Sequence, residues 1–162
     1  MNIAAMSESE HTVSRKELKV EEKITLASKL SEIARVPPWL ENLAARYRIP
    51  ERVRFGMDVC LEEVLSNIVR HGYRGAPDHA ILVTYGNPRI GTFTLVIEDE
   101  APFFNPLLSR DERVGSLEQA SEGGQGIRLV RQFSDKLDYE ATATGNRLTI
   151  CFVVPEASRT AV

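Results

Sequence analysis

The chain has 162 residues, of which 43% are hydrophobic and 27% are charged, and its 23 acidic and 20 basic side chains give a formal net charge of −3. This length and composition are typical of one globular domain and leave little room for a second core. The acidic balance does not favour a polyanionic partner, so direct binding to nucleic acid is not expected. The sequence has neither the run of about 18 apolar residues that a membrane span needs nor the apolar stretch of a signal peptide.

The polar residues 1–15 have little to bury and are predicted to be flexible. We expect residues 16–155 to form the single domain and residues 156–162 to form a tail. The two cysteines, Cys60 and Cys151, lie far apart and have no neighbouring cysteine or histidine at the spacing of a zinc site. We therefore expect both to be buried, reduced thiols of a cytoplasmic protein.

Hydrophobic periodicity predicts the order of the secondary-structure elements. The first half should contain a strand, a short helical turn and two helices, at residues 16–24, 30–34, 38–47 and 50–71. The second half should begin with two strands, at residues 81–85 and 92–98, joined by a turn at 86–89. A long loop at 101–126, a helix at 126–133 and two further strands at 136–141 and 147–154 should follow. This order predicts an α+β fold with helices on one face of a sheet.

Three polar residues follow one edge of the longer predicted helix. Glu63, Asn67 and His71 recur every four residues beside its apolar stripe, so they lie on the same side of the helix. An amide oxygen in this position is able to ligate a hard cation such as Mg²⁺, and a carboxylate is able to orient or deprotonate an attacking hydroxyl. Taken alone, such a trio more commonly borders a solvated helix face.

A carboxylate marks the end of a predicted central strand. Asp99 is followed by a segment with two prolines and two phenylalanines, residues 100–106. A carboxylate at a strand end is able to accept a hydrogen bond from the exocyclic amine of a base, and this would select adenine over guanine. The alternative is a loop aspartate that makes only a local turn bond.

A glycine-rich segment, Gly123-Gly124-Gln125-Gly126, leads into the predicted helix that follows the long loop. Glycines let the backbone approach a phosphate, and the free N–H groups of a helix N-terminus attract negative charge. The segment matches neither the P-loop pattern nor the complete dinucleotide-binding pattern, and no βαβ unit surrounds it. An ordinary loop is the simplest alternative for this segment by itself.

The three motifs in this order resemble the ATP-binding domain of the anti-sigma-factor serine/threonine kinases, of the RsbW and SpoIIAB type. Residues 61–67 with His71-Gly72-Tyr73 are similar to the N box of that family, residues 99–106 to its first glycine box and residues 123–131 to its second. The resemblance covers residues 16–154. It implies a Bergerat-type, histidine-kinase-like ATPase fold, which is a two-layer α/β sandwich with a mixed, mostly antiparallel sheet and helices on one face.

The resemblance also implies a role for individual residues. Glu63 matches the catalytic base, Asn67 matches the Mg²⁺ ligand that holds the phosphates, and Asp99 matches the aspartate that binds adenine. Residues 107–122 correspond to the mobile lid over the phosphates. The other residues expected to contact the nucleotide are His71, Ala101, Phe104, Gly123, Gly124, Gln125, Gly126 and Ile127. At Ala101 the chain departs from the family, which commonly has glycine there.

The function implied by the resemblance is that of a kinase in a bacterial partner-switching pathway. Such a protein uses ATP and Mg²⁺ to phosphorylate a STAS-domain anti-anti-sigma factor, sequesters a sigma factor or another regulator, and is expected to form a homodimer. One alternative is a sequestering module that binds ATP without significant turnover, which the presence of both Glu63 and Asn67 disfavours. A second is an interaction protein that has lost nucleotide binding, for which Ala101 is the supporting feature.

Overall fold

The computed structural model of the chain describes residues 20–108 and 123–155. The segments predicted to be flexible at 1–15 and to form a tail at 156–162 lie outside these residues. Most of the predicted lid, residues 107–122, lies outside them as well. Among the helices that the structure describes, none is long and apolar enough to cross a membrane.

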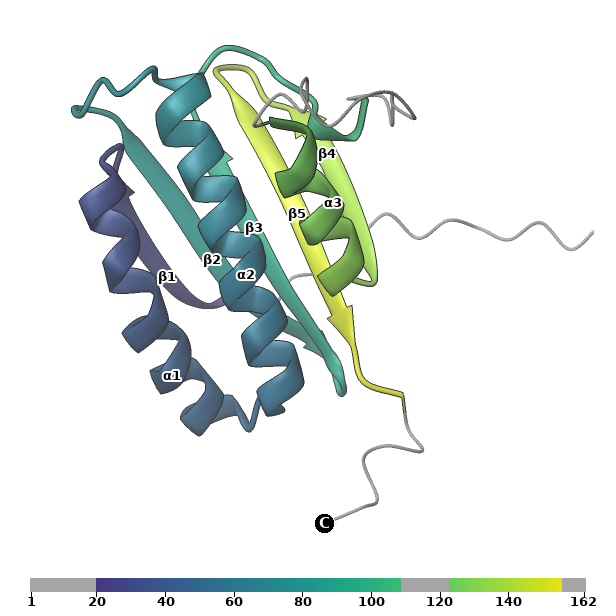
Figure 1. Cartoon of the computed structure of the whole chain (residues 1–162). Helices are drawn as coiled ribbons and strands as arrows, with labels where there is room; N and C mark the ends of the chain where they lie inside the picture. The colour runs from purple at the N-terminus through teal and green to yellow at the C-terminus, as the bar shows by residue number, and fades with distance from the viewer. Residues whose placement is uncertain (1–19, 109–122, 156–162) are drawn as a thin grey trace, which may run out of the picture.

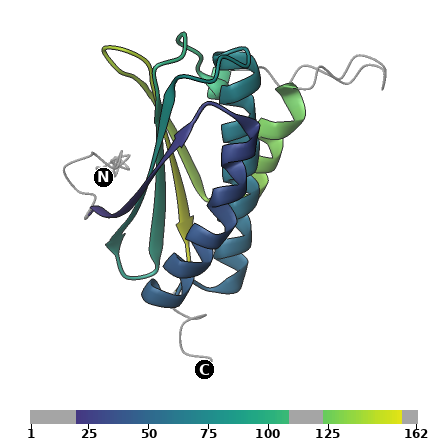
Figure 2. The same ribbon diagram turned by 90° about the vertical axis from the view of Figure 1, so that its left-hand side faces the viewer.

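The described residues form two layers, a five-stranded sheet and three α-helices that cover one of its faces (Figures 1 and 2). The strand order is β1-β2-β3-β5-β4, and each of the four neighbouring pairs is antiparallel. The main elements are β1 (Val20–Ala27), α1 (Val36–Tyr47), α2 (Glu51–Asn67), β2 (Ala80–Arg89), β3 (Thr92–Asp99), α3 (Gly123–Phe133), β4 (Lys136–Ala141) and β5 (Asn146–Val153). The predicted α+β sandwich is confirmed, with an antiparallel sheet where the resemblance implied a mixed one.

Three short helical segments complete the described chain. They are the 3₁₀ turns η1 (Leu30–Arg35) and η3 (Pro106–Leu108) and the π-helical turn η2 (Ile68–Gly72). The helix α1 follows η1 directly, with proline in its first turn as the sequence predicted. It ends at Tyr47, and the left-handed backbone of Arg48, at φ 51°, brings the N–H of Ile49 to the carbonyl oxygen of Ala44 over 3.1 Å.

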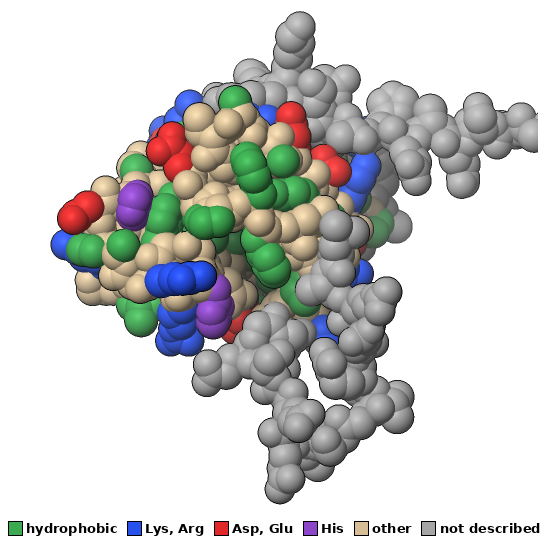
Figure 3. Space-filling model, turned by 90° about the horizontal axis from the view of Figure 1, so that it is seen from above, with side chains coloured by type: hydrophobic (Ala, Val, Ile, Leu, Met, Phe, Trp, Pro, Cys, Tyr) green, Lys and Arg blue, Asp and Glu red, His purple; other side chains and the backbone are tan. Residues whose placement is uncertain are grey.

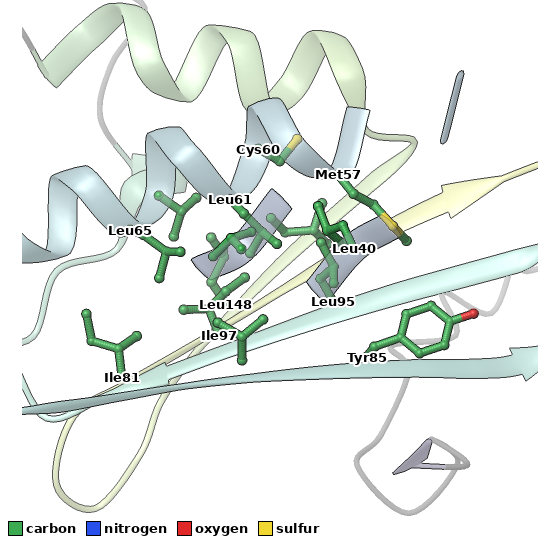
Figure 4. Close-up of a cluster of buried hydrophobic side chains, with 14 of the residues drawn as sticks. Leu40, Met57, Cys60, Leu61, Leu65, Ile81, Tyr85, Leu95, Ile97 and Leu148 are labelled. Carbon is green, nitrogen blue, oxygen red and sulfur yellow. The ribbon is translucent and has the colours of Figure 1, made fainter. Parts of the chain in front are cut away.

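The helix α2 lies at the centre of the helical layer, between α1 and α3 (Figure 1). Four of its residues are completely buried against the sheet and the neighbouring helices, as Figure 4 shows: Met57, Cys60, Leu61 and Leu65. The strands supply alternate residues to the same core, among them Ile81, Tyr85, Leu95, Ile97, Leu148 and Ile150. This packing fixes the rotation of α2, because its buried stripe has only one way to face the sheet.

Both cysteines are free and buried, as expected. Cys60 on α2 lies toward α3, with its Sγ 3.8 Å from the carbonyl oxygen of Val130, and burial raises the pKa of its thiol to about 12. Cys151 lies on β5, and burial raises its pKa as well. Since the thiolate is the reactive form, both side chains behave as small apolar groups of the core.

The longer helix ends differently from the prediction, which continued it through His71. The α-helix stops at Asn67, and residues 68–72 form a π-helical turn in which the N–H of Tyr73 donates to the carbonyl of Ile68 over 2.8 Å. Periodicity alone does not distinguish the two, because a single wider turn keeps the chain helical. The π turn matters for function, since such turns are frequent at functional sites and change the direction of the side chains that follow.

Two strand boundaries also differ from the prediction. The strand β2 continues to Arg89, so the turn lies at Ile90 and Gly91 instead of 86–89. Gly91 has the left-handed backbone that the turn requires, at φ 76°. The glycine and proline at 86–89 lie within the strand, at an irregularity where the pairing register shifts between Gly86 and Arg89. The described part of the first strand, residues 20–27, continues past the predicted end at 24, and residues 16–19 of the prediction lie outside the described residues.

Replacing Leu61 with alanine tests the importance of the α2 stripe for stability. We expect the free energy of unfolding to fall by about 2–5 kcal/mol, because the change removes buried methyl groups and leaves a cavity. Chemical denaturation measures the loss. The matched control is Glu62→Ala, one residue along the same helix and exposed to solvent. Equal stability of the two variants would contradict the assigned orientation of α2.

Candidate functional site

Four segments meet at one end of the sandwich, where α2 and β3 end, α3 begins and the β4–β5 hairpin turns (Figure 1). A cavity of about 760 Å³ lies between them, within the range of about 300–1,000 Å³ that is usual for small-molecule sites. Viewed onto this end, hydrophobic side chains gather around the hollow with basic and histidine side chains beside them (Figure 3). Six of the residues expected to contact a nucleotide line the cavity: Asn67, His71, Asp99, Ala101, Phe104 and Ile127.

The first turn of α3 packs directly on the polar edge of α2. A Cβ atom added at Gly126 would lie 2.6 Å from Oε2 of Glu63 and 3.1 Å from Nδ2 of Asn67. A side chain at this position would displace the ends of the Glu63 and Asn67 side chains, so glycine allows the closest approach. The glycine-rich segment and the Glu63–Asn67 pair, which are distant in the sequence, therefore form one surface.

Asp99 is the buried carboxylate of the site, with 8% of its surface exposed. Its Oδ1 accepts hydrogen bonds from the backbone N–H of Ala101 and from Nδ2 of Asn146, each over 2.9 Å. Burial raises the pKa of Asp99, and these two hydrogen bonds, which favour the ionised form, oppose the rise.

The turn after β3 is held from the side of the π turn as well. The hydroxyl of Tyr73 accepts a hydrogen bond from the backbone N–H of Glu100 over 2.8 Å, and the Tyr73 ring stacks on His79 with 4.4 Å between ring centroids. Tyr73 is buried, and burial raises the pKa of its hydroxyl, so the group remains neutral at physiological pH.

The departure at Ala101 is accommodated within the wall of the cavity. Ala101 is buried, and a Cβ added at Gly72 would lie 2.9 Å from the Ala101 Cβ. The extra methyl group of Ala101 thus occupies space that the absence of a side chain at Gly72 leaves open.

Other predicted residues lie next to the cavity without lining it. Gly123, Gly124 and Gln125 already belong to the first turn of α3, where the sequence predicted a loop. Glu63 is partly exposed and contacts the glycine turn instead of the cavity. The described residues contain no group of three or more His, Cys, Asp or Glu side chains that would hold a metal ion by themselves, so a cation here would need phosphate oxygens as additional ligands.

Three polar lining residues lie outside the three predicted motifs, namely Arg74, Tyr139 and Asn146. Arg74 has a left-handed backbone, at φ 51°, and is followed by Gly75 at φ 78°. Asn146 follows Gly145 in a segment whose composition indicates only a turn. The alternation of side chains along β4 and β5 predicts which residues share a face of the sheet. It does not distinguish a residue that contacts a ligand from a residue of the core.

The cavity combines apolar walls with a few polar groups in defined positions. A buried carboxylate and an amide that is able to ligate a cation line it, and the glycine N-terminus of α3 lies beside that amide. This arrangement suits a flat ring with an exocyclic amine at one end and an anionic group at the other. Such groups define a nucleotide-binding site of the kind found in ATP-binding α+β sandwiches.

Comparison with known proteins agrees with this class of site. Residues 26–152 match the family described as histidine kinase-like ATPase domain. Over 113 residues, 69% of this chain and 79% of the relative, the chain is 34% identical to the serine/threonine-protein kinase BtrW of Bordetella bronchiseptica. The chain therefore belongs to the histidine kinase-like ATPase domain family, and the family predicted from the three motifs is confirmed.

Among solved structures, the histidine kinase domain from the Erythrobacter litoralis EL346 blue-light activated histidine kinase matches 80% of this chain with a TM-score of 0.49 and 15% identity. The match spans 63% of that chain, so this protein covers less than two thirds of its length.

The affinity for ATP and ADP should depend on the ionisation of Asp99. Protonation would turn the carboxylate oxygen that is to accept from the base into a donor. The affinity for ATP and ADP should therefore fall as the pH decreases through the pKa of Asp99. Because burial raises this pKa, the fall should begin above the ordinary range of an aspartate. Calorimetry between about pH 8 and pH 4.5 measures the dependence, with Asp99→Asn as the reference because an amide takes up no proton in this range.

At neutral pH, Asp99→Asn itself should weaken ATP and ADP alike by about 1–3 kcal/mol, the cost of leaving a buried polar group without its partner. A change confined to one of the two nucleotides, or a parallel pH dependence in the variant, would remove Asp99 from the base site.

Proposed function

We propose that this chain is an ATP-dependent protein-serine/threonine kinase that phosphorylates a STAS-domain anti-anti-sigma factor. When it is not engaged with that partner, it sequesters a sigma factor or another regulator. The observation that carries the proposal is the contact of Gly126 with both Glu63 and Asn67 beside the cavity that Asp99 lines. The 34% identity to a serine/threonine-protein kinase supports the choice of activity.

Each end of the proposed substrate has suitable groups. The adenine ring would lie between the apolar walls and donate its amine hydrogen to Asp99. The phosphates would lie toward Asn67 and the first turn of α3, where the free N–H groups attract negative charge. Mg²⁺, when bound, would be held by Asn67 together with the phosphate oxygens and would neutralise part of their charge.

The proposed reaction transfers the γ-phosphoryl group to a serine or threonine of the partner. The hydroxyl oxygen forms a bond to the γ-phosphorus, and the bond from phosphorus to the bridging oxygen breaks, leaving its electron pair on ADP. The hydroxyl proton moves to the Glu63 carboxylate. Since phosphoryl transfer depends mainly on positioning and electrostatic stabilisation, the chain needs few groups beyond these.

The role of Asn67 is tested by Asn67→Ala. We expect the variant to lose the Mg²⁺-dependent part of ATP binding while it keeps its thermal stability, because Asn67 is partly exposed at the edge of the core. Calorimetry with ATP, in Mg²⁺ and in EDTA, measures the difference. The exposed Asn42→Ala on α1 is the matched control. Unchanged Mg·ATP affinity in Asn67→Ala would exclude Asn67 from the metal site.

The kinase activity is tested by Glu63→Gln, which keeps the shape of the side chain but removes the base. Mg·ATP binding should persist, whereas phosphorylation of the cognate STAS protein should fall by roughly 10²–10⁴-fold, the range for losing a general base. Glu62→Gln, its exposed neighbour, should transfer phosphate at the wild-type rate.

The same assay separates the competing functions. A wild-type protein that binds Mg·ATP and the STAS partner without phosphorylating it would be a sequestering module, and the kinase proposal would fail. A wild-type rate in Glu63→Gln with a slow Glu62→Gln would move the base to Glu62.

A further inference from the structure

Asn146 is the first residue of β5 and has no role in the sequence-based description of the site. It pairs with Asp99 of β3 on one side and with Ala141 of β4 on the other. Only 8% of its surface is exposed, and it lines the cavity. A buried amide at this place requires an explanation, because burial of a polar group is unfavourable unless its hydrogen bonds are made.

The Asn146 amide makes hydrogen bonds on both of its sides. Its Nδ2 donates to Asp99 Oδ1 over 2.9 Å and lies 3.1 Å from the Ala101 carbonyl oxygen and 3.4 Å from that of Pro102. Its Oδ1 accepts from the backbone N–H of Phe104 over 3.0 Å and from the Tyr139 hydroxyl over 2.7 Å. The nitrogen faces only acceptors and the oxygen only donors, so the surroundings determine the orientation of the amide.

For Asp99 the consequence is an asymmetric carboxylate. Its Oδ1 is taken by the Ala101 N–H and by Asn146. Within residues 20–108 and 123–155, no hydrogen bond reaches its Oδ2. The two donors on Oδ1 prevent the carboxylate from rotating and keep any proton off that oxygen, so Oδ2 is the acceptor that remains for a ligand.

We propose that Asn146 is a positioning residue of the nucleobase pocket. It holds Asp99 with Oδ2 available to the amine of a 6-aminopurine, and it holds the turn at 101–104 that forms the adjacent wall. The inference rests on the proposed use of the cavity for an adenine nucleotide. An amide is suited to this position because it donates to the carboxylate and accepts from Phe104 and Tyr139 at the same time.

Gly145 brings Asn146 close enough to act in this way. A Cβ added at Gly145 would overlap the carbonyl oxygen of Asp99 and lie 2.6 Å from the Cα of Glu100. The hairpin backbone therefore rests directly on the end of β3. The turn itself is closed by separate hydrogen bonds, from the Gly145 N–H to Oγ1 of Thr142 over 3.0 Å and from the Thr142 N–H to the Gly145 carbonyl over 2.9 Å.

These separate bonds provide a matched control. Thr142→Ala removes a side-chain hydrogen bond of the same hairpin without touching Asp99. Asn146→Ala removes all the bonds of the amide. Asn146→Asp keeps the size of the side chain and its acceptor oxygen for Phe104 and Tyr139, but it replaces the donor to Asp99 with a second carboxylate.

The experiment measures ADP affinity by calorimetry between about pH 5.5 and pH 8.5, with thermal unfolding at each pH. At pH 8 both Asn146 variants should bind ADP roughly tenfold or more weakly than the wild type, since a hydrogen bond to a charged group is lost. On acidification Asn146→Asp should recover toward wild-type affinity, because a proton shared between the two carboxylates replaces the amide donor. Asn146→Ala should not recover.

Other titratable and charged groups also face this region: Tyr73, Glu100 and Tyr139 around Asp99, and His71 and Arg74 at the cavity. All of them are present in the wild type and in each variant, so the ratio of affinities at each pH isolates the change at position 146.

The outcomes separate the inference from the function on which it rests. Failure of the wild type to bind ADP would overturn the nucleotide site and the inference together. Wild-type binding combined with wild-type affinity in Asn146→Asp at pH 8 would overturn the inference alone. An equal loss in Thr142→Ala would do the same, because it would assign the effect to the hairpin. If Asn146→Ala does not fold, the shape-matched Asn146→Asp and its pH dependence carry the test.

Discussion

The packing of α2 against the sheet is the constraint on which the functional end of the molecule depends. Met57, Leu61 and Leu65 are completely buried, so α2 has one rotation about its axis and one depth in the helical layer. That rotation turns Glu63 and Asn67 toward the first turn of α3, where Gly126 lies against both. The positions of these polar side chains are thus set by buried apolar residues of the same helix.

The end of β3 is the second constraint on the site, and hydrogen bonds from two other elements hold it in place. Tyr73, which follows the π turn, accepts from the N–H of Glu100, and Asn146 of β5 binds Asp99 and the turn beyond it. Ala101 fits between these ties because Gly72 carries no side chain. The end of β3 is therefore held by hydrogen bonds from two elements, which is favourable for a site that must present one carboxylate oxygen in a defined direction.

The helices and strands were largely predictable because their apolar residues recur at the helical or the strand period. The location of Asn67 and Asp99 at one cavity was also predictable, since each stands in a motif of distinctive order. The π turn at 68–72 was not predictable, because hydrophobic periodicity is insensitive to one wider turn. The turn at Ile90 was not predicted because the glycine, asparagine and proline at 86–89 indicate a turn more strongly. Asn146 was missed because an asparagine after glycine indicates a local turn, whereas its partners at Asp99, Ala101 and Phe104 lie 42 to 47 residues away in the sequence.

A crystal structure of the protein with Mg²⁺ and a non-hydrolysable ATP analogue tests the central claim most directly. The account predicts the adenine amine within hydrogen-bond distance of Asp99 Oδ2, the Asn146 amide still on Oδ1, and the cation bound to Asn67 and the phosphate oxygens. A nucleotide bound outside this cavity, or bound there with the base away from Asp99, would contradict it.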